Sequence, residues 1–143
     1  MSIKNIRLEV MQLLEKKVDS FMNDFLIPVE KIWQPSDLLP DSEKETFFED
    51  VTELREIAKE LPYDFWVVLV GDTITEEALP TYESWLTEVE GVDSEGRNGW
   101  SKWVKHWTGE ENRHGDVLNK YLYLSGRVNM REIEMTTQHL IND

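Results

Sequence analysis

The chain has 143 residues and a formal charge of −14, because 29 aspartates and glutamates outnumber 15 lysines and arginines. Its 40% apolar content is typical of a globular domain, and the lack of cysteine excludes disulfides and thiol-based metal or catalytic sites. The acidic balance argues against nucleic-acid binding. Without a recognisable signal or transit segment, or an apolar run of about 20 residues, a cytoplasmic protein with no membrane association is expected.

Two stretches near the start of the chain have apolar residues at helical spacing. They predict amphipathic helices over 3–27 and 43–60, each followed by a proline. The prolines between them make 28–42 an extended connector. We expect these segments to belong to one domain that covers residues 1–143.

The middle of the chain is less clear. The continuous apolar run FWVVLV at 65–70 fits a buried strand as well as a buried helix. The segment 74–90 has a helical pattern with a kink at its proline, and 91–99 is a turn-rich loop. The longest helical pattern follows over 100–125, and a last helix is expected near 129–140.

The helix over 100–125 has ionisable groups in the middle of its apolar stripe. Continuing the three- or four-residue spacing across the helix centre reaches Glu111 and His114, whereas Arg113 falls off the stripe. An unpaired buried carboxylate is costly, so the pair predicts either a metal site or a plain hydrogen-bonded pair. The spacing leaves both open. The apolar stripe consists of Trp100, Trp103, Val104, Trp107, Leu118, Tyr121 and Leu122.

A second carboxylate comes from the helical segment that precedes the loop. Periodicity predicts that one of Glu76 and Glu77 faces inward and the other faces solvent, without deciding which. If this helix and the helix over 100–125 pack as antiparallel neighbours, Glu76 would face Glu111 and His114.

Three strings of the sequence identify a family. They are IPVEKIWQPSDLLPD (27–41), VVLVGDTITEEALPTY (67–82) and WTGEENRHGDVLNKYLYLSGRVNMREIE (107–134), and they closely resemble the soluble acyl-acyl-carrier-protein desaturases of the stearoyl type. The resemblance implies an all-α, ferritin-like di-iron helical bundle. This chain would form its N-terminal half, with two long antiparallel helices and flanking helices. The resemblance therefore makes FWVVLV a helix.

The resemblance also implies a site. Glu76, Glu111 and His114 would be iron ligands in a centre of two Fe²⁺, with Glu111 bridging the irons. Trp33, the tryptophan of the EKIWQP string, would lie against His114 and orient it. No catalytic residue beyond the metal ligands is implied.

The implied activity is O2-dependent desaturation of a saturated fatty acyl chain on acyl carrier protein, which introduces a cis double bond in fatty acid biosynthesis. Ferredoxin would supply the electrons, and a homodimer is expected. Acyl carrier proteins are acidic, so a chain at −14 is an unexpected docking partner. Lys16, Lys17, Lys102 and Lys105 are the local basic groups, and we expect the main docking patch elsewhere.

The chain departs from the family in length. Members run more than twice as far, so one chain offers three of the six expected iron ligands. The simplest interpretation is a truncated desaturase. One alternative is a non-catalytic helical module, and another is a homodimer in which two half-sites meet. A different ferritin-like di-iron protein is disfavoured by the string around Trp33 and by 75–80.

Overall fold

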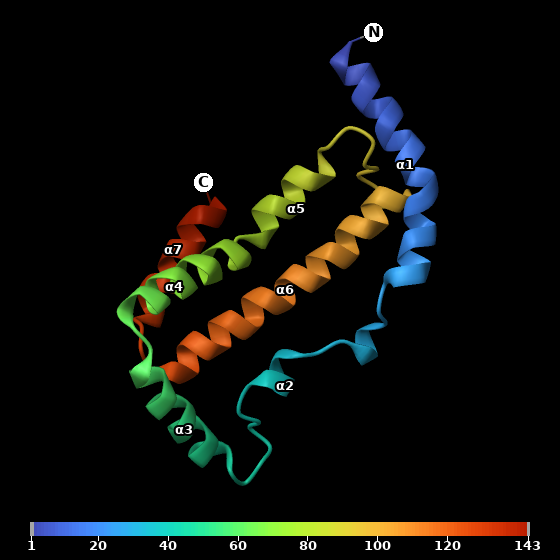
Figure 1. The fold of residues 1–143 in the computed structure, drawn as a ribbon. Coiled ribbons are helices and arrows are strands. Elements are labelled where there is room, and N and C mark those ends of the chain that lie inside the picture. Colours follow the sequence, from blue (N-terminus) through green and yellow to red (C-terminus); the bar gives the residue numbers. More distant parts are fainter. Residues whose placement is uncertain (1, 143) are drawn as a thin grey trace. The chain divides into compact units, whose positions relative to one another are not determined.

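The computed structural model describes residues 2–142, and all regular structure among them is helical (Figure 1). This confirms the all-α prediction and is consistent with a ferritin-like helical bundle. A short 3-10 turn, η1, spans Val29–Lys31. The α-helices are α1 (Ile3–Phe25), α2 (Pro35–Leu38), α3 (Phe47–Glu60), α4 (Tyr63–Glu77), α5 (Leu79–Thr87), α6 (Gly99–Ser125) and α7 (Met130–Asn142).

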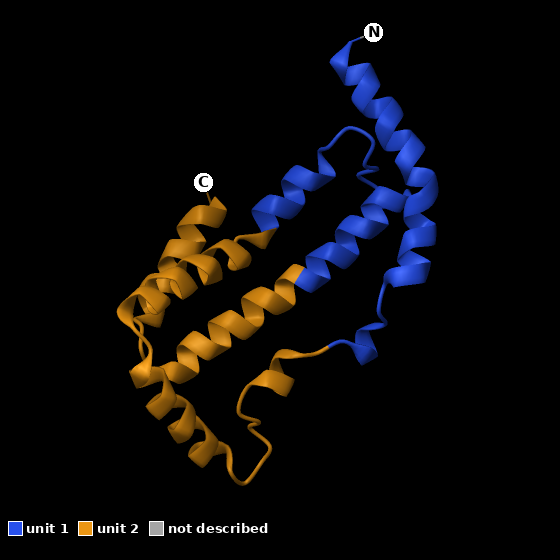
Figure 2. Ribbon diagram, viewed as in Figure 1, with its two compact units in different colours: residues 1–32, 80–110 blue, residues 33–79, 111–143 orange. Residues whose placement is uncertain are grey.

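The chain forms two compact units, which Figure 2 distinguishes by colour. Unit 1 comprises Met1–Ile32 and Pro80–Glu110, and unit 2 comprises Trp33–Leu79 and Glu111–Asp143. Helix α6 runs through both. The predicted ligands and Trp33 all belong to unit 2, so the candidate site is described within that unit.

The connector is less extended than its prolines predicted. It contains η1 and the single turn α2, and Pro35 begins α2 at the first helical position. Proline fits there because the amide that it lacks has no intrahelical partner. The Gln34 amide donates to the Asp37 carboxylate at 2.7 Å, which completes a capping box around this turn.

The apolar run at 65–70 lies inside α4, as the resemblance implied. Pro80 breaks the following segment rather than only kinking it. Helix α4 ends at Glu77, and α5 begins at Leu79 with Pro80 in its first turn. The Ala78 amide between them still donates to the carbonyls of α4 at Ile74 and Thr75, both at 3.2 Å.

Unit 2 is organised around a small apolar core. Ala58 of α3, Trp66 of α4, Leu122 of α6 and Ile133 of α7 are buried together. Within this unit, α7 lies beside α4, and α4 runs antiparallel to α6 (Figure 1). Shared burial of these four side chains holds α4 and the C-terminal part of α6 in place, and these two helices carry the site.

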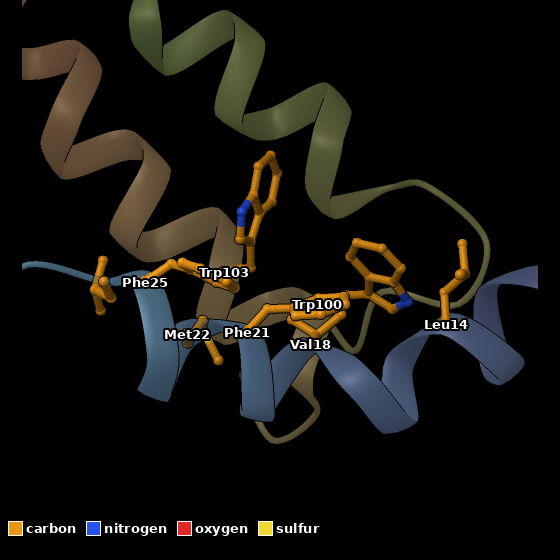
Figure 3. A pocket seen from close by; sticks show the side chains of 8 residues that line it. Leu14, Val18, Phe21, Met22, Phe25, Trp100 and Trp103 are labelled. Carbon is orange, nitrogen blue, oxygen red and sulfur yellow. The ribbon is translucent and has the colours of Figure 1, made fainter.

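In unit 1, α1 packs on the start of α6. The Trp100 indole Nε1 donates to the Met11 carbonyl at 2.9 Å, and the Gly99 amide donates to the Glu15 carboxylate at 3.3 Å. Beside these contacts lies an apolar groove of about 360 Å³, which Figure 3 shows from close by. It is lined by Leu14, Val18, Phe21, Met22, Phe25, Leu26, Trp100 and Trp103.

Asn98 positions the first turn of α6. Its side-chain oxygen accepts from the Ser101 amide at 3.0 Å, and its Nδ2 donates to the Gly91 carbonyl at 2.7 Å. One side chain thus satisfies a free amide at the helix start and closes the preceding loop. Among the described residues, no helix combines the length and apolarity that a membrane span needs.

Candidate metal centre

Two antiparallel helices bring the three predicted ligands together. Glu76 lies at the end of α4, and Glu111 and His114 lie one turn apart on α6. One ligand atom from each residue falls within 4.8 Å of the other two, and all three side chains are half-buried. The juxtaposition predicted for Glu76 is therefore present.

A glycine allows the two helices to approach at this point. A Cβ placed on Gly115 would lie 3.5 Å from the backbone and Cβ of Glu76, at ordinary van der Waals distance. The backbone of α4 therefore passes directly over that of α6 beside His114. A large side chain at this position would push Glu76 away from the other two residues.

The three groups interact with one another. His114 Nδ1 lies 3.1 Å from Glu111 Oε2, within hydrogen-bond distance. Burial raises the pKa of Glu76, and the charge of Glu111 and a hydrogen bond to it raise this pKa further. A proton on one of these two carboxylates reduces their mutual repulsion. A bound cation would have the same effect and would replace the proton.

Glu77 also faces partly inward, so the expectation that one of the adjacent glutamates faces solvent was wrong. Its carboxylate accepts a hydrogen bond from Asn119 Nδ2 of α6 at 2.8 Å. Burial is the main cause that raises the pKa of Glu77, and the bond to Asn119 opposes it. The two glutamates thus contact α6 in different ways.

Trp33 lies against the histidine of the cluster. The rings of Trp33 and His114 are stacked, with centroids 5.9 Å apart and planes 11° from parallel. The Arg113 guanidinium lies 5.1 Å from the centre of the same tryptophan ring. Trp33 is thus positioned to restrict rotation of the His114 ring.

Arg113 is the residue that sequence reasoning missed. Its position off the apolar stripe predicted an exposed side chain, but it is only 9% exposed. One contact that covers it comes from Trp33, which lies 80 positions earlier in the chain. Helical periodicity describes one helix at a time, so the residues of α6 held no signal of this contact.

Two carboxylates and an imidazole form a donor set that suits iron, manganese or zinc. Ligand atoms bound to one such ion lie about 3–4 Å apart, given bonds near 2.0–2.2 Å, so small side-chain shifts would suffice. Within residues 2–142 no other cluster of three such groups was found, and His106 and His139 belong to none. The residues therefore fit a metal ion.

Helix-borne carboxylates with a Glu-x-x-His pair define a class, the metal-binding helical bundles. Comparison with known proteins identifies the family of the chain. Residues 6–143 match the family described as fatty acid desaturase, and the chain belongs to that family.

Over 138 aligned residues, named relatives are more than half identical to the chain. It is 56% identical to stearoyl-[acyl-carrier-protein] 9-desaturase 5, chloroplastic, of Arabidopsis thaliana. It is 55% identical to acyl-[acyl-carrier-protein] desaturase, chloroplastic, of Cucumis sativus, and 54% to the Ricinus communis stearoyl enzyme. Each match covers 94% of this chain but 35% of the relative. The chain thus spans about a third of the length of these curated relatives.

Proposed function

We propose that Glu76, Glu111 and His114 are iron ligands, and that this chain contributes them to the di-iron centre of an acyl-acyl-carrier-protein desaturase. The observation that carries the proposal is the cluster itself: the three residues gather on α4 and α6. Membership of the fatty acid desaturase family supports iron over other metals. With three donors in the chain, half of the ligand set would come from elsewhere.

Bound iron would supply the activation of O2 that removes hydrogen from two adjacent methylenes. The residues of this chain would hold and orient the metal. Glu111 interacts with both His114 and Glu76, so these three side chains would hold the metal together. Trp33 would keep the His114 ring in one orientation.

The substrate and partners are proposed from the relatives' names, which specify stearoyl or acyl chains on acyl carrier protein. We assign this chain to the same class of substrate, with formation of a cis double bond and ferredoxin as the electron donor. The expected cytoplasmic location stays a prediction; the relatives are named as chloroplastic. We also propose that the protein forms a homodimer.

A second candidate is a non-catalytic helical module that keeps the fold of this part of the family. The observation in its favour is that the described residues gather only three metal donors, half of the six that a di-iron centre would need. An assay with acyl-acyl-carrier protein, reduced ferredoxin and O2 separates the two candidates. Formation of an unsaturated product that His114→Ala abolishes would exclude the non-catalytic module.

Metal binding is the direct test of the proposed site. Anaerobic Fe²⁺ binding, followed by metal analysis after desalting, should weaken at least tenfold in Glu76→Ala, Glu111→Ala and His114→Ala. His106→Ala is the matched control, because it removes an exposed histidine of the same helix outside the cluster. Equal iron binding by all four variants would contradict the proposed site.

A further inference from the structure

The candidate ligand Glu76 stands at a helix end, where a side chain is harder to hold in place than in a helix centre. It is the second-last residue of α4, which ends at Glu77. The last carbonyls of a helix have no amide partner within it, and helix ends open more readily than helix centres. The position of a metal ligand here therefore depends on contacts from outside α4.

One such contact is the hydrogen bond between Glu77 and Asn119. The Asn119 Nδ2 of α6 donates to the Glu77 carboxylate at 2.8 Å, which joins two residues 42 positions apart in the chain. Both side chains are half-buried, and a hydrogen bond is electrostatically stronger inside a protein than in water. This bond ties the last residue of α4 to α6.

Asn119 lies on the same side of α6 as the two other residues that meet the end of α4. Glu111, Gly115 and Asn119 follow one another at a spacing of four, so they line one side of the helix. The Glu111 carboxylate interacts with that of Glu76, and Gly115 lies beside the backbone of Glu76. Three successive turns of α6 thus contact the last two residues of α4.

We propose that Asn119 and Glu77 are positioning residues of the metal centre. Their hydrogen bond fixes the end of α4 on α6 and so holds the Glu76 carboxylate beside the other two ligands. Glu77 itself lies outside the ligand cluster. The inference rests on the proposed metal site and adds two residues that act through Glu76.

The test reverses the direction of this hydrogen bond. Asn119→Asp removes the donor and, at about pH 8, sets one ionised carboxylate against another. Glu77→Gln keeps an acceptor oxygen for Asn119 and should leave metal binding close to that of the wild type. Combining the two substitutions restores a bond, because the introduced amide can donate to the introduced carboxylate. Both substitutions preserve the size of the side chain.

Co²⁺ titration of the whole protein, followed by visible absorption, provides the readout. Asn119→Asp should weaken Co²⁺ binding about tenfold, and adding Glu77→Gln should recover most of the loss. In a Glu76→Ala background, Asn119→Asp should have no further effect, because the bond acts through that ligand. Asn98→Ala is the matched control. It removes a hydrogen-bonding asparagine at the other end of α6 and should keep the wild-type Co²⁺ affinity and spectrum.

The outcomes separate the positioning role from the metal site. Wild-type Co²⁺ affinity in Asn119→Asp, or a loss that Glu77→Gln does not reverse, would overturn the positioning role and leave the ligands standing. An equal loss with and without Glu76 would overturn it too, since the effect would then bypass that ligand. If the wild-type protein binds no Co²⁺, or if Glu111→Ala leaves binding unchanged, the metal site and the positioning role both fail.

Discussion

At the scale of single residues, the close approach of the Glu76 and Glu111 carboxylates affects the stability of the metal-free chain. The pKa of Glu76 lies above its ordinary value of 4.5 in the folded chain. The folded chain therefore holds this proton more tightly than the unfolded chain does. The resulting stabilisation is complete below the unfolded pKa and is lost as the pH rises through the folded pKa.

Glu76→Gln should accordingly stabilise the chelated chain at neutral pH, and should reduce the loss of stability that occurs as the pH rises through the raised pKa of Glu76. Glu111→Ala should stabilise it for the same reason, because it removes the neighbouring charge. Thermal unfolding in chelator measures both. Glu53→Gln is the control, since Glu53 is an exposed residue of α3. A lower melting temperature for Glu76→Gln than for Glu53→Gln would contradict this account.

Trp33 is a positioning residue rather than a ligand. Trp33→Ala should lower metal affinity about tenfold, as expected for the loss of a group that orients a metal-bound histidine. Trp33→Phe keeps an aromatic ring against His114 and should restore most of the affinity. Titration with Co²⁺, followed by its visible absorption, measures this. If Ala and Phe weaken binding equally, stacking is not what orients the histidine.

At the scale of elements, the crossing of α4 over α6 depends on Gly115. Gly115→Ala adds a methyl group at ordinary contact distance and should stabilise the chain by up to about 1 kcal/mol, because alanine favours helix. Gly115→Leu should separate the helices and lower metal affinity. Chemical denaturation and Co²⁺ titration measure the two effects. Equal metal affinity in the Leu and Ala variants would show that the crossing does not set the ligand positions.

The start of α6 depends on a different side chain. Asn98→Ala removes the acceptor for the Ser101 amide and the donor to Gly91, and should cost about 1 kcal/mol of unfolding free energy. Asn98→Asp keeps the acceptor and should lose less. Urea denaturation measures both variants. A destabilisation of Asn98→Asp as large as that of Asn98→Ala would mean that the contact to Gly91 dominates.

The sequence predicted the features that depend on neighbouring residues of one helix, and it did not predict those that depend on contacts between distant segments. The stripe on α6 singled out Glu111 and His114, which lie together with Glu76 in the structure, and the loop before α6 was found from its turn residues. The choice between Glu76 and Glu77 needed the position of a second helix. The contact of Arg113 with Trp33 joins two distant segments, and neither feature could be inferred from periodicity within one helix.

At the scale of the whole molecule, the structure separates a few acidic residues from the rest. Of the 29 acidic residues, a small group beside α6 is half-buried and interacting, and it includes the candidate ligands. The chain matches about a third of the length of its relatives. We expect the remaining metal ligands to approach the cluster on α4 and α6 from outside the described residues.

The most direct measurement of the central claim is the position of a bound metal. Crystals of the chain loaded with Mn²⁺, measured at the metal absorption edge, should show an anomalous peak in coordination contact with the carboxylates of Glu76 and Glu111 and with the His114 ring. A peak bound to other residues, or none at these three in metal-loaded crystals, would contradict the assignment of Glu76, Glu111 and His114 as metal ligands.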